Sequence, residues 1–292
     1  MPTASVLIPV HNGAATVEQA IVSVLAQDLD NIELLVCDDG STDGTVAVVR
    51  SFEDPRLRLL TNPENLGVGA TRNRLIAEAR GEWIAFLDAD DVFLPGKLTR
   101  CLRELEQAGG DALAHRMHYI TRRGLRGTLP ARPYFSSAFV VRASLARSVP
   151  GYREDLRANQ EPDFFDSLGT VRILKERLGG YRLRNDSITD RLWFDKRLAA
   201  HWYDRNPRRP APPDLRAWYR GEHGSLRRGL LVTSWYGQRC GRRAAVHLLE
   251  GEYLRAAGFA ALSVICNPLY LAHRAWVRLL PGPVRGEGLP TE

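Results

Sequence analysis

Three carboxylates within four positions follow a short apolar run. The run spans residues 83–87 and reads WIAFL, and the acids after it are Asp88, Asp90 and Asp91. Carboxylates this close repel one another unless a cation lies among them, and hard oxygen ligands suit Mg²⁺ or Mn²⁺. The stretch therefore predicts a divalent-metal site that carries a phosphorylated ligand. The alternative is an aspartate-rich turn that caps the following helix.

Strands and helices alternate over residues 1–110. Apolar runs indicate strands, and apolar residues at helical spacing indicate helices. Strands are expected over residues 6–10, 32–37, 57–60 and 83–87. Helices are expected over residues 17–25, 43–52, 70–79 and 97–107. This alternation predicts an α/β fold with a Rossmann-like, doubly wound and mostly parallel sheet.

Polar residues follow three of these expected strands. The segments are His11-Asn12-Gly13, Asp38-Asp39-Gly40 and Asp88-Ala89-Asp90. Ligands bind at the carboxyl ends of the strands in such sheets, so these segments should face one crevice.

The pattern weakens after residue 110. We expect a strand over residues 111–120, a strand leading into a helix over 139–145, and a helix over 164–178. Residues 206–214 hold four prolines and read as a linker. Residues 215–280 look helical, which predicts a C-terminal helical extension over 206–292.

Four motifs in this order resemble glycosyltransferase family 2, whose members have the GT-A fold. They read VLIPVHN at residues 6–12, VCDDGSTDGT at 36–45, NLGVGATRN at 65–73 and FLDADD at 86–91, with a weaker match, FVVR, at 139–142. The resemblance covers about residues 4–190. It implies a nucleotide-sugar-binding half over 1–110 and an acceptor-binding half over 111–205. It also implies an inverting transfer of a sugar from a nucleotide donor, UDP-linked in our prediction, to a hydroxyl of a glycan or lipid-linked acceptor.

The resemblance assigns a donor site to the strand ends. The matching residues near the base and ribose are Pro9, Val10, Asn12, Asp38 and Asp39. Asp38 would accept a hydrogen bond from the uracil ring nitrogen, for which a carboxylate is a strong acceptor. In the alternative interpretation, Asp39 and Asp43 cap the next helix.

A glycine-bearing loop and the acidic motif complete the implied donor site. Asn65, Gly67 and Arg72 match the loop beside the nucleotide, although Arg72 could instead be a surface partner for a carboxylate. Asp88 and Ala89 would contact the donor, and Asp90, with Asp88, would hold a Mn or Mg ion on the diphosphate. In a strand, Asp88 and Asp90 would point to the same side. The metal neutralises charge on the departing diphosphate.

An inverting transfer also needs a base for the acceptor hydroxyl. The turn VPGYREDL at residues 149–156 matches the family, and the expected glutamate-aspartate motif falls on residues 160–163, which read QEPD. We predict Glu161 as the base and keep Asp163 in reserve. Both could instead be acids that the dipole favours at a helix N-terminus.

Arg184 is a second departure from the family pattern. Relatives often carry a histidine at this position, near the diphosphate and metal. Charged arginine does not ligate a metal but pairs well with phosphate. We therefore expect Arg184 to share the neutralising role with a single, weakly held metal.

Charge divides the chain unevenly. Residues 1–110 carry a net charge of −8, and residues 111–292 carry +14. The basic part is either a surface for an anionic acceptor or membrane, or simply a set of solvated faces. Cysteines without metal or disulfide spacing and the lack of signal-peptide character at the N-terminus predict a cytoplasmic protein, peripheral at the inner face of the plasma membrane if it contacts lipid.

The apolar stretch over residues 256–280 has two interpretations. One is an amphipathic helix lying on a membrane surface. The other is a helix that packs on the catalytic domain or on a partner in a homodimer. Both remain open at the level of the sequence.

The same motifs bear on three other possible functions. A sugar-phosphate nucleotidyltransferase expects a glycine-rich loop with arginine and lysine after the first strand, where residues 11–15 read HNGAA. The altered base motif and Arg184 leave open a nucleotide-sugar-binding protein with impaired catalysis. Aromatic-basic recognition motifs are absent from the sequence, so no nucleic-acid partner is expected.

Overall fold

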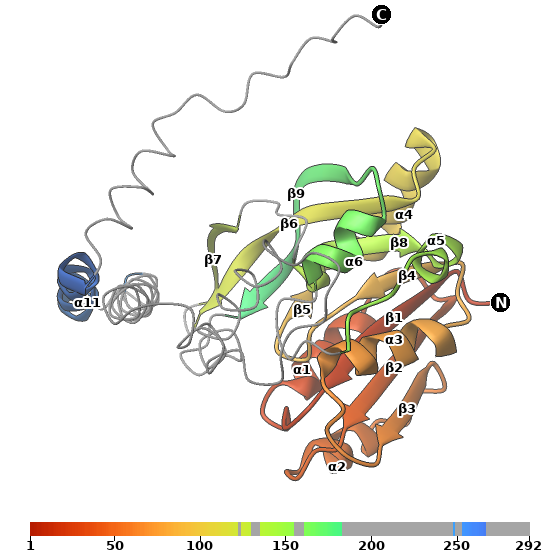
Figure 1. Ribbon diagram of the computed structural model, residues 1–292, viewed down its shortest axis with the longest axis horizontal. Helices are drawn as coiled ribbons and strands as arrows, with labels where there is room; N and C mark the ends of the chain where they lie inside the picture. Colours follow the sequence, from red (N-terminus) through yellow and green to blue (C-terminus); the bar gives the residue numbers. More distant parts are fainter. Residues whose placement is uncertain (122–123, 130–134, 155–160, 183–247, 249–252, 267–292) are drawn as a thin grey trace, which may run out of the picture. The chain divides into compact units, whose positions relative to one another are not determined.

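The computed structural model describes residues 1–121, 124–129, 135–154, 161–182, 248 and 253–266. The chain divides into two compact units, Met1–Arg184 and Asn185–Glu292. A nine-stranded sheet lies in the first unit, with the strand order β3-β2-β1-β4-β8-β6-β9-β5 and with β7 paired to β6 (Figure 1). Because β8, β6 and β9 belong to this same sheet, the two halves expected over residues 1–110 and 111–205 share one framework.

The first part of the chain forms the parallel half of the sheet. The strands are β1 (Ala4–Val10), β2 (Ile32–Asp39), β3 (Leu57–Asn62) and β4 (Trp83–Phe86), and they pair in parallel. The helices between them are α1 (Val17–Leu25), α2 (Thr45–Arg50) and α3 (Val68–Glu78). The expected alternation is confirmed. Because β2 and β4 flank β1, the winding reverses at β1, and α/β sheets bind ligands at such a point.

The later strands form a mixed half. They are β5 (Val92–Phe93), β6 (Ala112–Thr121), β7 (Gly124–Leu129), β8 (Phe139–Arg142) and β9 (Arg172–Arg182). The helices of this half are α4 (Lys97–Ala108), η1 (Ser136–Ala138), α5 (Ala143–Ser148) and α6 (Glu161–Ser167). β8 runs antiparallel to both β4 and β6, whereas β9 runs parallel to β6. The strand expected over 111–120 and the strand-to-helix passage at 139–145 are confirmed.

The helix expected over residues 164–178 is wrong. Helix α6 ends at Ser167, and β9 begins at Arg172. Gly169 lies between them with a φ of +72°, a conformation that favours glycine and commonly ends a helix. The buried residues Leu174 and Leu178 of β9 are four positions apart. That spacing fits one face of a helix as well as one face of a strand, so periodicity could not separate the two.

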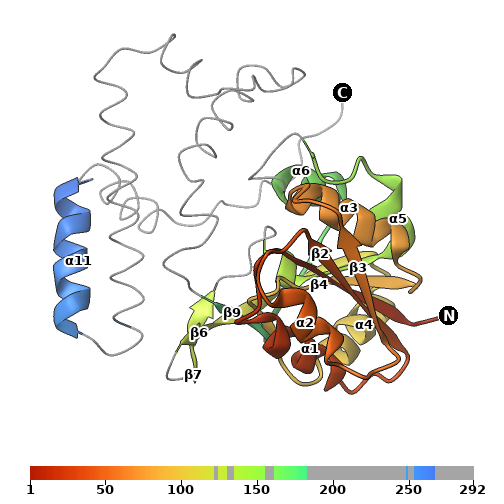
Figure 2. The same cartoon turned by 90° about the horizontal axis from the view of Figure 1, so that it is seen from below.

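Helices cover both faces of the sheet (Figures 1 and 2). Val6 and Ile8 of β1 belong to one core with α1, α2 and α4, and Leu7 belongs to the other with α3, α5 and α6. Successive strand residues point to opposite faces, so a strand buried on both sides reads as a continuous apolar run. This burial explains why the sequence of β1 shows no alternation.

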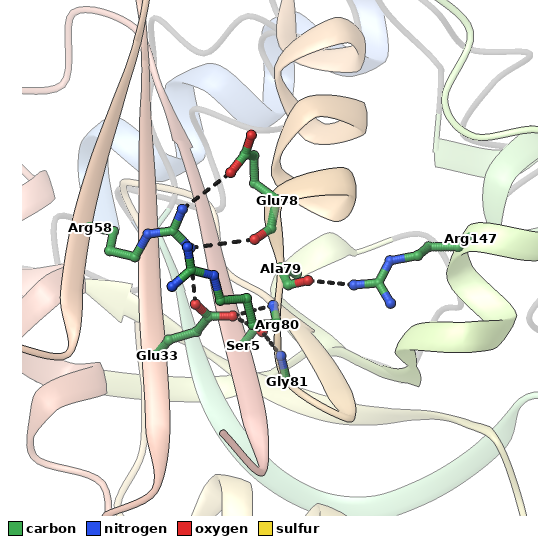
Figure 3. A network of polar contacts seen from close by, with 8 residues as sticks. All are labelled: Ser5, Glu33, Arg58, Glu78, Ala79, Arg80, Gly81 and Arg147. Carbon is green, nitrogen blue, oxygen red and sulfur yellow. Dashed lines mark hydrogen bonds and ion pairs between the residues drawn. The ribbon is translucent and has the colours of Figure 1, made fainter. Parts of the chain in front are cut away.

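A buried carboxylate ties the end of α3 to the amino ends of β1 and β2 (Figure 3). Glu33 accepts hydrogen bonds from the Ser5 hydroxyl (2.6 Å) and the Arg80 backbone N–H, and it pairs with Arg58 (3.2 Å). The Ser5 oxygen in turn accepts the Gly81 N–H (2.8 Å). A Cβ on Gly81 would lie 2.6 Å from the Ser5 nitrogen, so this close approach requires glycine.

The second unit is described by residue 248 and by α11 (Tyr253–Cys266). Leu254 of α11 is 92% exposed, whereas Ala256 is buried. Among the residues with described structure, none of the helices has the length and apolar character needed to span a membrane. The linker at 206–214, the domain boundary at 205 and most of the stretch 256–280 lie outside the described residues, so these expectations and the membrane or dimer contact stay predictions.

Candidate active site

The segments that follow β1, β2 and β4 interlock at the carboxyl edge of the sheet. The Asn12 N–H donates to the Ser41 hydroxyl (2.8 Å), and the Gly13 N–H donates to that of Thr45 (2.9 Å). A Cβ on Gly13 would lie 3.8 Å from the Cβ of Ala89, which places the segment after β1 against the one after β4. The three polar segments thus gather at one edge, as expected from the parallel strands.

Asp38 is a buried carboxylate with one oxygen unsatisfied. Its Oδ2 accepts the Ser41 N–H (3.1 Å), and the residue is 3% exposed. Its Oδ1 is buried and has no hydrogen-bond partner among the described residues. A buried polar atom without a partner is costly, and a donor on a ligand would remove that cost. This geometry suits the predicted contact with the uracil ring nitrogen.

Asp39 holds the loop that precedes α3. Its Oδ1 accepts hydrogen bonds from the Asn62 side chain (2.8 Å) and the Leu66 N–H (2.9 Å), and its Oδ2 accepts the Gly67 N–H (3.0 Å). Gly67 has a φ of +94°, which few other residues adopt. The predicted nucleotide contact of Asp39 stays a prediction. The bonds themselves show that Asp39 fixes the glycine loop.

The other expected donor-site residues lie at or near the same edge. Pro9 and Val10 are buried at the end of β1, and Asn12 and Asn65 are exposed. Asn12 has a φ of +52° in the left-handed region, which asparagine tolerates better than most residues. Its side-chain oxygen accepts the Thr42 N–H (2.9 Å), which joins the segment after β1 to the one after β2.

The acidic motif forms a turn directly after β4. β4 ends at Phe86, and the Asp91 N–H closes the turn by donating to the Asp88 carbonyl oxygen (3.0 Å). The strand argument therefore does not place Asp88 and Asp90 on one side. Both residues are partly exposed, so their carboxylates reach the surface of the edge.

Asp91 anchors this turn from beneath. Its Oδ2 accepts the Ser137 hydroxyl (2.6 Å), and its Oδ1 accepts the Arg182 N–H (2.9 Å). The same Ser137 oxygen accepts the Asp88 N–H (3.0 Å). Burial, together with the nearby charges of Asp90 and Asp88, raises the pKa of the Asp91 carboxyl well above its usual value. Through these bonds Asp91 holds the acidic turn against η1 and β9.

Two further cations support the turn. Lys97 is fully buried, and its Nζ donates to the Ser137 carbonyl oxygen (2.9 Å). Burial lowers the pKa of Lys97 to about 7. The Nε of Arg182 donates to the Asp90 carbonyl oxygen (2.9 Å). Sequence reasoning missed Ser137, Lys97 and Arg182 because they come from three separate elements and share no motif.

Arg72 joins the acidic turn at this edge to α6. The side chain is 3% exposed, and it pairs with Asp88 (2.7 Å) and with Glu161 (3.2 Å). Its guanidinium carbon lies 5.2 Å from the centre of the Tyr152 ring. Burial opposes the charge, but Asp88, Tyr152 and Glu161 hold the pKa of Arg72 above its usual range. Arg72 is thus a buried partner of two carboxylates and not a surface partner of one.

The two candidate bases occupy different environments in the first turn of α6. Glu161 faces Arg72 and its side chain is 23% exposed, whereas Asp163 is exposed to solvent. The structure therefore brings Glu161 to the side of Asp88. Gln160 and Arg184 lie outside the described residues, so the role expected of Arg184 is not placed.

The metal ligands predicted from the sequence form a small set. Within the described ranges, no group of three or more histidine, cysteine, aspartate or glutamate side chains could hold a metal ion. Asp88 and Asp90 offer two carboxylates at the edge.

Solved structures identify the fold. The chain is similar to residues 1–349 of TarS from S. aureus, solved in complex with UDP-GlcNAc, with a TM-score of 0.60 and 17% identity. The match covers 94% of this chain and 92% of that one. At this identity the likeness shows the fold alone, and the fold is GT-A, as the sequence motifs predicted.

The family follows from the sequence. The model of glycosyl transferase family 2 matches residues 5–169, which is more than half of the chain. The chain therefore belongs to glycosyl transferase family 2.

Curated relatives match in part. The putative glycosyltransferase EpsE of Bacillus subtilis is 29% identical over 215 residues, 64% of this chain and 74% of EpsE. The succinoglycan biosynthesis protein ExoO of Rhizobium meliloti is 37% identical over 121 residues, 41% of this chain and 35% of ExoO. The glucosyltransferase WfgD of Escherichia coli is 45% identical over 94 residues, 32% of this chain and 37% of WfgD. The chain thus spans little more than a third of ExoO or WfgD.

Proposed function

We propose that this chain is an inverting glycosyltransferase. It moves one sugar from a uridine diphosphate donor to a hydroxyl of a glycan or lipid-linked acceptor. The observation that carries the proposal is the buried bridge in which Arg72 joins Asp88, from the acidic turn, to Glu161 (2.7 and 3.2 Å). The bridge places Asp88, which we propose contacts the donor, and Glu161, the candidate base, on the same guanidinium.

Asp38 supports a uridine donor. Its unpartnered Oδ1 can accept the ring N–H of uracil, and the adjoining edge presents the exposed side chains of Asn12 and Asn65. The names of two similar proteins point the same way. WfgD acts from UDP-Glc on a diphosphoundecaprenol-linked sugar, and TarS was solved with UDP-GlcNAc. The lipid-linked acceptor that we propose for this chain is carried over from the likeness to WfgD.

Asp90 and Asp88 would hold the divalent ion. Mg²⁺ commonly takes one or two protein carboxylates and fills its remaining positions with waters and substrate phosphates, so two partly exposed acids suit it. The bound ion would neutralise charge on the departing diphosphate. Asp91, Ser137 and Arg182 keep the turn that carries both ligands in place.

The transfer uses Glu161 as a general base. The acceptor oxygen attacks the anomeric carbon and its proton passes to the Glu161 carboxylate. The bond from the anomeric carbon to the diphosphate oxygen breaks, and the nucleoside diphosphate leaves with the electron pair. Attack from the face opposite the leaving group inverts the anomeric centre. Glu161 suits this role better than Asp163, because Asp163 is exposed and Glu161 lies beside the bridge to Asp88.

Three experiments test the function. Calorimetric titration of UDP with and without Mn²⁺ should show binding that requires the metal. A panel of nucleotide sugars should then reveal a donor that the wild type hydrolyses slowly or transfers. Glu161→Gln should lower turnover about a hundredfold or more, because general-base catalysis contributes on that order, and should keep UDP affinity.

Asp163→Asn is the matched control, since it removes an acid two positions away in the same turn. It should leave turnover near the wild-type value. Metal-independent or absent UDP binding would contradict the proposal. Loss of turnover in Asp163→Asn with activity retained in Glu161→Gln would move the base to Asp163.

A further inference from the structure

Arg72 and Asn73 connect the donor edge to the segment that leads into α6. We propose that these two neighbours on α3 are positioning residues that hold Glu161 in line with the donor. The inference rests on the proposed function, and it gives Arg72 a task other than the nucleotide contact predicted from its motif. Their contacts reach residues 16 to 89 positions away in the chain.

Asn73 pins the turn before α6 through its backbone. Its Oδ1 accepts the Tyr152 N–H (2.7 Å), and its Nδ2 donates to the Tyr152 carbonyl oxygen (2.8 Å) and to Glu154 (2.8 Å). Gly151 has a φ of +46°, and a Cβ there would lie 2.8 Å from the Asn73 Oδ1. A side-chain amide that satisfies both backbone groups of one residue fixes that residue in place.

Tyr152 carries this restraint to α6. Its ring stacks on Phe164 with 4.3 Å between the ring centres and 19° between the planes. Phe164 and Phe165 are buried in the core between α6 and the sheet. The guanidinium carbon of Arg72 lies over the Tyr152 ring, 5.2 Å from its centre. Because α6 begins at Glu161, the packing of Tyr152 on Phe164 sets the position of its first turn.

Arg72 then fixes the carboxylate of that turn. A buried guanidinium needs charged partners, and it has Asp88 on one side and Glu161 on the other. The planar fork of arginine can hold two carboxylates at once, whereas lysine presents a point charge without a fork. The two ion pairs therefore set the separation between Asp88 and the candidate base, Glu161. A rate-limiting proton transfer would depend on this separation.

Arg72→Met is the central variant, tested in the full-length protein. It should lower kcat about a hundredfold, as misplacement of a catalytic group does, and leave the donor KM and the Kd of UDP with Mn²⁺ within about threefold. Arg72→Lys should recover part of kcat because the charge remains. Arg100→Met is the matched control. Arg100 also pairs with two carboxylates, Glu104 (3.0 Å) and Glu176 (2.8 Å), but on the surface of α4.

A readout independent of turnover separates this inference from the function. Urea unfolding of Arg72→Met, Glu161→Gln and the double variant forms a thermodynamic cycle. The effects on the unfolding constant should be non-additive by about fivefold or more, because the two side chains touch. Additive effects overturn the link.

Two kinetic results also overturn it. One is a wild-type kcat in Arg72→Met. The other is loss of UDP affinity with kcat retained at saturating donor, which would make Arg72 a nucleotide contact. A wild type that turns over no donor defeats the proposed function, and the unfolding cycle then still decides whether Arg72 holds Glu161.

Discussion

Asp38 and Asp39 are adjacent carboxylates at the end of β2, and they have different partners. Side chains of successive strand residues point to opposite faces, so neighbours in sequence meet different surroundings. Both oxygens of Asp39 accept hydrogen bonds from the protein, whereas one oxygen of Asp38 has no partner among the described residues. Asp39 shapes the loop, and Asp38 is left with the capacity to bind a ligand.

Asp38→Asn tests that difference. The amide can keep the bond to the Ser41 N–H through its oxygen, but it then presents an N–H₂ donor to the ring N–H of uracil. The Kd of UDP should rise about tenfold to a hundredfold, because a hydrogen bond to a charged acceptor is lost and two donors meet. Isothermal titration calorimetry with Mn²⁺ measures the change.

The control for this variant is Asp54→Asn. Asp54 pairs with Arg56 in the connection before β3. It should leave the Kd of UDP unchanged. An unaltered Kd in Asp38→Asn, with the fold intact by circular dichroism, would remove Asp38 from the nucleotide site.

Part of the candidate site could be predicted from residue types and order. The motifs around Asp38 and Asp88 indicated acids at strand ends, and the motif at residues 160–163 indicated Glu161 as a base. The structure places Asp88 and Glu161 on one arginine. The partners of Asp91, Ser137 and Arg182, could not be found from the sequence. Those partners depend on β6, β8 and β9 joining one sheet, which is a long-range arrangement that local spacing does not encode.

Helix α3 is fixed at both of its ends. Near its start, Arg72 reaches the acidic turn and α6, and just beyond its end the Gly81 N–H and the Arg80 N–H meet Ser5 and Glu33 on the strands (Figure 3). A helix held at one end could pivot about that point. Anchors at the amino ends and at the carboxyl ends of the parallel strands instead fix the position of Arg72 relative to the acidic turn.

Gly81→Ala tests the distant anchor. The added Cβ would meet backbone atoms of β1, at 2.6 Å from the Ser5 nitrogen and 2.7 Å from the Ala4 carbonyl carbon. Backbone cannot yield as a flexible side chain can, so the free energy of unfolding should fall by about 1–3 kcal/mol. Urea denaturation measures it. Gly110→Ala is the control, because its Cβ would meet only the Leu105 side chain, at an ordinary 3.6 Å, and it should stay close to wild type.

The elements were predictable where burial on two faces made the pattern plain. β1 through α3 agree with the expected ranges to within a few residues because their apolar runs are continuous or clearly helical. The region after Ser148 was harder, since α6 has seven residues and β9 exposes most of its first six. A strand of that kind carries little apolar signal, and Leu174 and Leu178 matched a helix equally well.

At the scale of the whole chain, the sheet and both large core clusters lie in the unit Met1–Arg184. The buried residues of those clusters run from Ala4 to Leu178. The acidic first part supplies the strand ends, and the basic charge, +14 over residues 111–292, lies mostly beyond the parallel strands. The proposed donor site therefore draws its framework from the first unit.

This arrangement predicts that a chain ending at residue 190 folds alone and binds the donor nucleotide. Ending the chain at residue 190 retains Arg184 and keeps the new C-terminal carboxylate several residues away from it in the sequence. A unit with its own core should unfold cooperatively in urea, and it should bind UDP with Mn²⁺ within about threefold of the full chain. Transfer to an acceptor should be weaker if residues 191–292 contribute to acceptor binding. Cooperative folding with loss of UDP binding would instead place part of the donor site in the second unit.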